Sequence, residues 1–340
     1  MDATDRHYHS IDFMKGICVL FIIITHYSWE NTERLRFLFP FWIHMAVPIF
    51  MIISGFVYTK SFLKKGIDTI DKVYTVDFFF GKVIRYTVPF TIAFLIEEII
   101  FKAVGASSHS IKQIIYAFLS GGYGPGSYYY PIMVQFIFYF PIIYAIIRKY
   151  ERNGLVLCGF INLIFEVLKW AYFMNEECYR LLIFRYTLVI AYGCYLAINP
   201  HKRDRKLSII CVCTGITYIV LCEYIGIAPP ITNLWTGPSF WACLFIIPIA
   251  APMILSKIHN RVIELFGRAS YNIFLVQMVY YLAADRIYGL VPNRLLQLII
   301  NLIVCVIAGV VFYFFETPVT KMVNNKMYSL WNKYRETISV

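Results

Sequence analysis

Apolar residues gather in ten long blocks along this chain, and short polar segments separate the blocks. Each block has about the 17–25 residues that an α-helix needs to cross the hydrocarbon core of a bilayer. Because the blocks are solidly apolar and do not alternate with polar positions, they predict helices and not the strands of a transmembrane barrel. We therefore expect an all-α integral membrane protein in which about ten transmembrane helices form one bundle. The expected spans are residues 11–29, 40–62, 86–104, 130–148, 155–173, 181–199, 207–228, 238–257, 272–290 and 295–316.

Two stretches do not fit this pattern. Residues 59–85 are mixed and basic, and residues 105–129 contain most of the Gly- and Tyr-rich run GGYGPGSYYY. After the tenth span, Pro318 is expected to end the helix, because proline lacks the N–H that would continue it. We thus predict a transmembrane domain over residues 1–320 and a short basic tail over residues 321–340.

The composition agrees with this class. The chain of 340 residues is 59% hydrophobic and 15% charged, whereas a soluble domain is about 45–50% apolar and about 25% charged. An aromatic content of 18% excludes a disordered chain. Eight of the nine cysteines fall in apolar runs and no Cys-x-x-Cys pair exists, so we expect buried thiols and no disulfide framework or metal site.

The Lys and Arg residues are divided unevenly between the two sides of the expected membrane. With the N-terminus in the cytoplasm, 21 of the 31 lie on the cytoplasmic side, 7 lie on the opposite side and 3 lie within spans. The positive-inside rule then predicts that both termini are cytoplasmic. The net charge of +11 is explained by this topology, so we expect the lipid bilayer as a partner and no nucleic acid.

Three ionisable residues lie in the first expected span. Lys15 and His26 are 11 residues apart, which is about 16.5 Å of helical rise and close to three full turns, so both side chains lie on one helix face. Asp12 precedes Lys15 by three residues and can pair with it. One interpretation makes Asp12 and Lys15 residues of the membrane interface, with His26 bonded to a neighbouring helix. In the other interpretation, the His26 imidazole serves as a general base.

Other candidate residues also have two interpretations each. Ser54 and Gly55 in the second span are typical of a close helix–helix contact or of a ligand site. Lys82 and Arg85 share a face at the cytoplasmic entrance of the third span, where they either bind a phosphorylated ligand or anchor the helix. The aromatic run offers faces that stack on sugar rings, or it forms an interfacial belt. Its three consecutive tyrosines are Tyr128, Tyr129 and Tyr130.

Five sequence blocks, in order, resemble those of the acyltransferase 3 family of polytopic membrane proteins. They are IDFMKGICVLFIIITH (11–26), PIFMIISGF (48–56), GKVIRYTVP (81–89), FGRASYNIFLVQ (266–277) and FFETP (314–318). The resemblance covers nearly the whole chain.

The first block is similar to the family's pattern of a basic residue followed after ten residues by histidine. Lys15 stands where the family usually has Arg, which keeps the charge but loses the planar fork. Gln277 stands where a second histidine is common. The resemblance implies that Lys15 and His26 belong to the active site.

The resemblance also implies the reaction. An acyl group, often acetyl, moves from a cytoplasmic donor such as acetyl-CoA to a hydroxyl of a cell-envelope carbohydrate, in the plasma membrane of a bacterial cell. We expect no permanently bound cofactor, with acetyl-CoA or another acyl-CoA as co-substrate. In this hypothesis His26 is the general base, or is itself acylated transiently. The further expected roles are donor binding by Lys15, Lys82, Arg85 and Ser54, acceptor binding by Tyr128, Tyr129 and Tyr130, and support by Asp12, Tyr271, Gln277 and Glu316.

Two other functions stay open at this point. A transporter would use the intramembrane charges Glu97, Glu98, Glu166 and Lys169, the last two forming an i,i+3 pair, as a pathway. No inverted repeat and no matching pair of broken spans supports this function. A non-catalytic component of polysaccharide assembly would tolerate the loss of His26.

Overall fold

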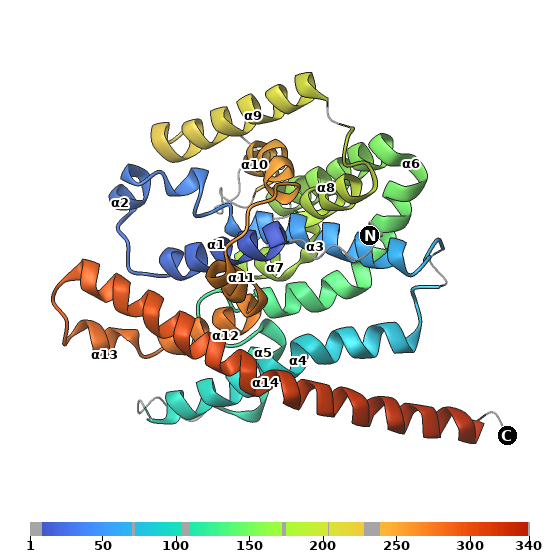
Figure 1. Cartoon of the computed structure of the whole chain (residues 1–340). Helices are drawn as coiled ribbons and strands as arrows, with labels where there is room; N and C mark the ends of the chain where they lie inside the picture. The colour runs from blue at the N-terminus through green and yellow to red at the C-terminus, as the bar shows by residue number, and fades with distance from the viewer. Residues whose placement is uncertain are drawn as a thin grey trace. The chain divides into compact units, whose positions relative to one another are not determined.

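In the computed structural model of the chain (Figure 1), helices are the regular secondary structure of the described part, and turns and loops connect them. The described residues are 9–69, 72–103, 109–171, 175–202, 204–227 and 239–338. They form fourteen α-helices and three shorter helical turns, with no strand among them. The expected all-α class is thus confirmed. Where the sequence predicts one bundle, the contacts divide the chain into two compact units. Unit 1 comprises Met1–Ile70 and Tyr139–Arg268, and unit 2 comprises Asp71–Phe138 and Ala269–Val340.

Unit 1 contains eight complete α-helices among the described residues. They are α1 (His9–Thr25), α2 (Asn31–Arg36), α3 (Ala46–Lys64), α7 (Glu176–Leu181), α8 (Thr187–Ile198), α9 (Arg205–Ile219), α10 (Phe240–Ile254) and α11 (Arg261–Arg268), with helical turns at Phe39–Phe41, Ile183–Tyr186 and Val220–Ile225. Helix α6 (Tyr129–Ala171) belongs to unit 1 from Tyr139 onward.

Glycines bring several helices of unit 1 into close backbone contact, and two of these helix pairs include a helix with a family-like sequence block. A Cβ added to Gly55 of α3 would lie 2.2 Å from the carbonyl oxygen of Ile190 in α8. A Cβ on Gly193 of α8 would likewise lie 2.0 Å from the carbonyl oxygen of Ile52. Backbones this close leave no room for a side chain, which is the small-residue packing of membrane helices. The helix-contact interpretation of Gly55 is therefore confirmed.

The second pair is α1 and α11, which lie against each other in Figure 1. A Cβ on Gly267 of α11 would lie 1.8 Å from the carbonyl oxygen of Asp12, and one on Gly16 would lie 2.1 Å from that of Ile263. Helix α11 therefore fixes the first turns of α1, where the polar residues of the first sequence block lie.

Helix α6 contains two expected spans joined by a sharp bend. Its 43 residues are helical except at Glu151, where φ is 45° and ψ is −114°. A positive φ is costly for a residue with a side chain. Glu151 lies inside the predicted connection 149–154. The boundary between the spans 130–148 and 155–173 is thus confirmed as a bend, although no loop of non-helical residues separates them.

Unit 2 is built from the segments that follow the basic connection and from the C-terminal third. Its helices are α4 (Val76–Ala103), α5 (Ile111–Ser120), the start of α6, α12 (Ser270–Tyr281), α13 (Ala284–Tyr288) and α14 (Arg294–Ile338). Helix α12 packs on α14 where a Cβ on Gly309 would lie 2.4 Å from the Cα of Ile273. Helix α14 also packs on α4.

Two expectations for the C-terminal region are wrong. Pro318 does not end the last helix, because α14 continues through it to Ile338. Next to the proline, the Thr317 hydroxyl donates to the carbonyl oxygen of Tyr313 at 2.7 Å. The predicted span 272–290 is also not one helix, since the chain breaks between α12 and α13 at residues 282–283.

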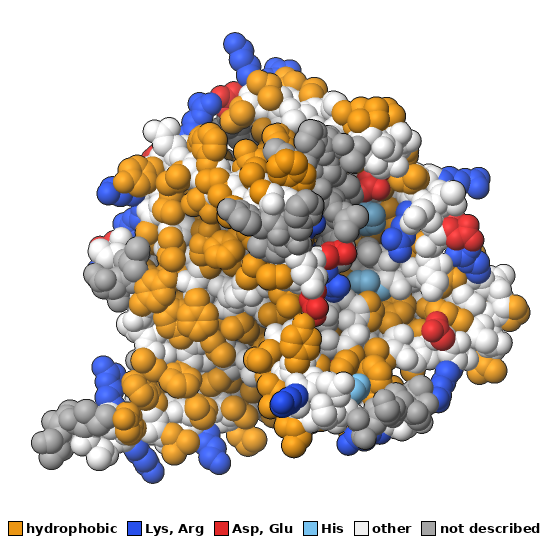
Figure 2. All heavy atoms as spheres, turned by 180° about the vertical axis from the view of Figure 1, so that it is seen from behind, with side chains coloured by type: hydrophobic (Ala, Val, Ile, Leu, Met, Phe, Trp, Pro, Cys, Tyr) orange, Lys and Arg blue, Asp and Glu red, His pale blue; other side chains and the backbone are white. Residues whose placement is uncertain are grey.

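Four helical segments are long and apolar enough to cross a membrane, judged by length and composition. They are Phe39–Lys64, Tyr129–Ala171, Arg205–Ile225 and Arg294–Arg335. Helix α1 has only 17 residues, and α4 is long but carries several charges, so these two are not among the four. Many large apolar side chains are exposed, and they cover much of the face shown in Figure 2. This surface is that of an integral membrane protein, whereas the number of ten spans stays a prediction.

Candidate active site

Of the two family-pattern residues of the first sequence block, Lys15 lies in the first half of α1 and His26 follows directly after its last residue, both in unit 1. Near the start of the helix, the Lys15 ammonium donates to Asp12 Oδ1 at 3.0 Å, which confirms the expected i,i+3 pair. Asp12 is only 5% exposed. A buried carboxylate is costly without a partner. The ion pair with Lys15 compensates the charge of Asp12, and it also fixes the direction of the Lys15 side chain.

His26 directly follows the last residue of α1. Its backbone N–H donates to the carbonyl oxygen of Ile22 at 3.3 Å, so it continues the last helical turn. Ideal helical geometry gives a rise of about 16.5 Å from Lys15 to His26, and the expectation that both side chains share one face stays a prediction. The side chain of His26 is half-buried.

Aromatic packing fixes the chain after His26. The Trp29 indole N–H donates to the carbonyl oxygen of Ile24 at 2.7 Å, which turns the chain back toward the helix end. Tyr27 is 3% exposed and meets the Trp29 ring edge-on at 5.2 Å between centroids. Trp29 in turn meets Phe39 at 5.1 Å. Edge-to-face contacts of this kind hold the position of the His26 backbone.

The predicted donor-binding residues lie in both units. Ser54 lies on α3 of unit 1, half-buried and next to the glycine that contacts α8. Lys82 and Arg85 lie in the first part of α4 in unit 2, half-buried and exposed respectively. Close to them, Phe80 packs on Trp331 of α14 at 6.1 Å between ring centroids. The donor-binding role of these residues stays a prediction.

The three tyrosines of the aromatic run are packed in the interior of unit 2. Tyr128, Tyr129 and Tyr130 are each less than 10% exposed. The Tyr130 ring stacks on Phe90 at 3.8 Å between centroids, and its hydroxyl lies 3.2 Å from that of Thr87. These contacts give the tyrosines a packing role, and acceptor binding by them stays a prediction.

Helix α12 places its polar side chains on three different partners in unit 2. The Tyr271 hydroxyl donates to the carbonyl oxygen of Tyr86 at 3.0 Å. The Gln277 amide donates to the carbonyl oxygen of Pro125 at 3.0 Å, so the residue that stands in place of a histidine holds the Gly-rich loop. Because Gln277 is fully buried, its side chain fixes that loop to α12.

The last two sequence blocks meet where Asn272 of α12 contacts Glu316 of α14. Asn272 is not among the candidate functional residues expected from the sequence. Its amide donates to Glu316 Oε2 at 3.1 Å, and the Thr320 hydroxyl donates to the other oxygen of the same carboxylate. Asn272 and Glu316 are both buried. A polar amide one residue after the Ser-Tyr pair, inside an apolar helix, is the signal that could have identified this contact.

The Gly-rich loop is also bound to α4 through Glu97. The backbone N–H groups of Tyr123 and Gly124 donate to its two carboxylate oxygens at 3.0 and 3.2 Å. The Tyr123 hydroxyl donates to the neighbouring Glu98 at 2.6 Å. Gly122 has a φ of 103°, and a Cβ there would lie 2.5 Å from the Glu97 carboxylate. The glycine and the carboxylate thus require each other.

A buried charged cluster in unit 1 surrounds Glu166. The Tyr179 hydroxyl donates to its carboxylate at 2.8 Å, and the backbone N–H of Phe240 donates at 3.3 Å. Arg185, which is 1% exposed, stacks over Tyr179 at 5.5 Å from the ring centroid. Lys169 also lies over the Tyr179 ring. Sequence spacing indicates Lys169 as a partner of Glu166, but it could not identify Tyr179 in a separate helix.

Comparison with known families decides what these residues belong to. A family model for an acyltransferase domain matches residues 8–314 of the chain. The chain belongs to the acyltransferase 3 family. The match begins just before α1 and ends within α14, so the acyltransferase 3 domain includes helices of both units. The expected family is confirmed, and membership implies a transferase activity. No curated protein and no solved structure matches the chain.

Proposed function

We propose that this acyltransferase 3 protein is a membrane O-acetyltransferase. It moves an acyl group from a cytoplasmic acyl-CoA to a hydroxyl of a cell-envelope carbohydrate. The observation that carries the proposal is the arrangement of α1, which has a fixed cation near one end and a half-buried imidazole at the other. One rigid helix separates them by about 16.5 Å, which is of the order of an extended pantetheine arm.

The proposed reaction uses His26 as the general base. The imidazole accepts the proton of the acceptor hydroxyl while the hydroxyl oxygen attacks the thioester carbonyl. The new C–O bond forms, the C–S bond breaks, and the thiolate of coenzyme A leaves and takes up the proton from His26. General-base catalysis of this kind contributes about 10²–10⁴-fold to the rate.

Lys15 has a separate role in this proposal. Its ammonium attracts the phosphates of the nucleotide at the start of α1, while Asp12 orients it. A lysine acts on phosphate as a point charge and not as a bidentate fork. A lysine at this position is therefore sufficient to attract the nucleotide phosphates. Under this proposal, the Lys15→Arg protein retains activity.

The decisive test replaces His26 by Ala and measures transfer of label from radiolabelled acetyl-CoA in membranes. We expect about 10²–10⁴-fold less transfer. The matched control is His201→Ala, which removes an exposed histidine of unit 1 outside α1 and should leave transfer unchanged. Undiminished transfer in the His26→Ala protein, at equal amounts of folded protein, would contradict the proposal.

The topology belongs to the same proposal. Ten spans with both termini in the cytoplasm place the start of α1 next to the cytoplasmic donor and His26 toward the outer side. Transport is the competing function for such a chain, and uptake into proteoliposomes without acyl transfer would favour it. The Glu97 carboxylate, which a transporter would use, accepts two backbone N–H groups of the Gly-rich loop. This bonding supports a structural role for Glu97 and weakens the transport alternative.

A further inference from the structure

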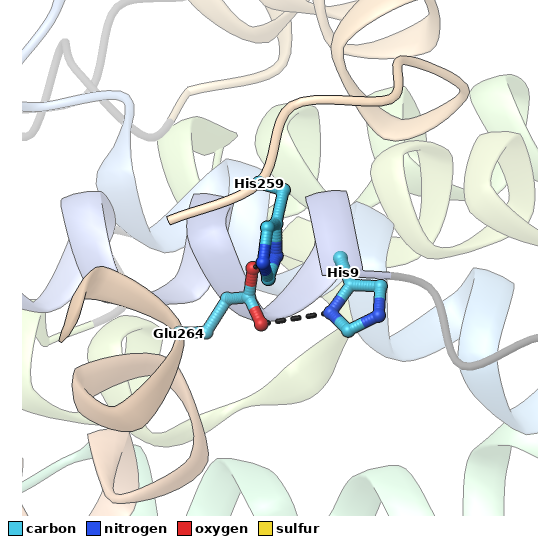
Figure 3. A group of neighbouring side chains, drawn as sticks. All are labelled: His9, His259 and Glu264. Atoms are coloured by element: carbon cyan, nitrogen blue, oxygen red, sulfur yellow. Dashed lines mark hydrogen bonds and ion pairs between the residues drawn. The ribbon is translucent and has the colours of Figure 1, made fainter. Parts of the chain in front are cut away.

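Three side chains meet at the start of α1, outside the candidate active site. His9 opens α1, His259 precedes α11, and Glu264 lies in the first turn of α11. The Nδ1 atom of His9 lies 2.8 Å from Glu264 Oε2, and the Nδ1 atom of His259 contacts the other carboxylate oxygen. Figure 3 shows both imidazole rings directed at this one carboxylate.

The packing of unit 1 explains why His9 and Glu264, 255 positions apart in the chain, meet here. The Ser10 hydroxyl donates to the carbonyl oxygen of Ile254 at 2.8 Å, which fixes the start of α1 to the end of α10. The glycine contacts between α1 and α11 then bring the two helices together just beyond this point. The three side chains are therefore held by backbone that is itself closely packed.

The environment of Glu264 is that of an anionic ligand. The residue is 5% exposed, while the two imidazoles are about half exposed. Burial by itself raises the pKa of the Glu264 carboxyl, but hydrogen bonds from His9, His259 and the backbone N–H of Asn260 outweigh this effect and hold the pKa below its ordinary value. The carboxylate is thus ionised at neutral pH, and its imidazole neighbours can be reached from solvent.

Imidazole nitrogens and carboxylate oxygens are among the ligand atoms that zinc prefers. Two imidazole nitrogens and one carboxylate oxygen, with a fourth position left to water, form a known type of zinc centre. Ligand atoms of the three residues all lie within 4.8 Å of one another, whereas two ligands of a tetrahedral zinc ion lie about 3.3 Å apart. Each imidazole nitrogen lies closer than this to a carboxylate oxygen, 2.8 Å in the case of His9, so binding an ion requires these pairs to separate slightly and the more distant ligand atoms to approach. Side-chain rotations can supply both movements, because the two rings are about half exposed.

We propose that His9, His259 and Glu264 bind one divalent transition-metal ion of the zinc class. Within unit 1, the ion joins the start of α1 to α11. Helix α1 carries the Asp12–Lys15 pair one turn further along, so the metal also stabilises the position of that pair. The site does not depend on acyl transfer, and it can be tested without an enzyme assay.

The test uses the full chain in detergent, purified through a tag without histidine. Co²⁺ serves as the probe, because a tetrahedral nitrogen and oxygen site gives visible absorption when it binds. We expect one Co²⁺ per chain, displaced by Zn²⁺. Loss of a ligand should cost more than the 10–100-fold that loss of a supporting residue costs in metal sites, so His259→Ala and Glu264→Gln should bind Co²⁺ about 100-fold more weakly or worse.

The controls separate this site from other histidines and from misfolding. His201→Ala removes an exposed histidine elsewhere in unit 1 and should bind Co²⁺ as the unchanged chain does. Zn²⁺ should raise the melting temperature of the unchanged chain and not that of His9→Ala, whose half-exposed ring can be removed without a core defect. Absence of stoichiometric Co²⁺ binding, or equal binding by the His259→Ala protein, overturns the proposal and leaves a hydrogen-bonded cluster only.

Discussion

Unit 1 and unit 2 bury their backbones by different means. In unit 1, pairs of helices approach until glycines touch carbonyl oxygens, at α3–α8 and at α1–α11. In unit 2, buried side chains bond to loop or helix backbone, as Glu97 does with the Gly-rich loop and Gln277 does with Pro125. At these places unit 1 depends on the absence of side chains, and unit 2 depends on particular polar ones. The contrast is one of emphasis, because unit 2 also has a glycine contact at Gly309, and Glu166 of unit 1 also accepts a backbone N–H.

This difference has a consequence for the proposed chemistry. Helix α1 carries Lys15 and leads directly into His26, and its first half is fixed by direct backbone contact with α11. Backbone contact leaves little freedom for α1 to tilt, which suits a helix that holds two groups at a constant distance. In unit 2, hydrogen bonds with Glu97 of α4 and Gln277 of α12 hold the Gly-rich loop in one conformation.

The largest effect on stability is expected from Gly267→Ala in unit 1. The new Cβ would lie 1.8 Å from the Asp12 carbonyl oxygen, and backbone cannot move aside as a flexible side chain can. We expect a loss of about 3 kcal/mol or more in the free energy of unfolding, at the upper end for overpacking. Thermal unfolding in detergent measures it.

The matched control is Gly159→Ala in α6. There the nearest heavy atom, a Leu188 methyl carbon, would lie at 3.7 Å, which is ordinary contact. Since alanine favours a helix over glycine by about 1 kcal/mol, this variant should be as stable as the unchanged chain or more so. Equal stability of the two variants would show that α1 and α11 do not make the backbone contact described.

A smaller effect is expected from Glu97→Ala in unit 2. The change leaves the N–H groups of Tyr123 and Gly124 without their carboxylate. An unsatisfied buried donor costs about 1–3 kcal/mol, so the melting temperature should fall and a protease should cut sooner within residues 121–127. Both can be followed on the same purified protein.

Glu98→Ala is the control for that variant. It removes only the bond from the Tyr123 hydroxyl and the contact with His109, and it leaves the backbone N–H groups bonded. We expect a smaller loss of stability and no faster cleavage of the loop. If Glu98→Ala loosens the loop as much as Glu97→Ala does, the side-chain bond, and not the backbone bonds, holds it.

The smallest effect is expected at the exposed end of α9 in unit 1. Asp204 caps this helix by accepting the N–H of Leu207 at 3.1 Å, and this bond holds the pKa of its carboxyl below the ordinary value. A lowered pKa adds stability above the unfolded value of about 3.9, and this stability is lost as the pH falls through the folded pKa. The small difference in melting temperature between the unchanged chain and Asp204→Asn should therefore begin to shrink below about pH 3.9 and disappear once the pH is below the lowered folded pKa of Asp204. A difference that persists there would assign the effect to cap geometry and not to charge.

The sequence predicts the helices best where the apolar pattern is long and uninterrupted. It correctly predicts a division between two helical segments near Glu151, which the structure shows as a bend within α6, and the i,i+3 pair of Asp12 and Lys15. It fails at Pro318, because the loss of one backbone N–H does not by itself end a helix whose other turns remain bonded, and α14 continues to Ile338. It also fails to find the break between α12 and α13, where the apolar pattern continues without a helix.

Contacts between distant segments could not be predicted from spacing. Asn272 meets Glu316 from 44 residues away, and Tyr179 meets Glu166 from another helix. The His9, His259 and Glu264 cluster has no local pattern, since its members lie in two segments that only the packing of α1 on α11 brings together. A periodic pattern reports which face of a helix is buried, but it contains no information on which helix covers that face.

The amino-acid sequence by itself determined the helical membrane class, the family, and the distance along one helix between Lys15 and His26, because these follow from local hydrophobicity and from the fixed rise of an α-helix. Only the tertiary structure decided which helices touch, which carboxylates accept backbone N–H groups, and where two histidines and a glutamate meet. Such choices depend on close packing between segments far apart in the chain, and close packing is a property of the folded molecule as a whole.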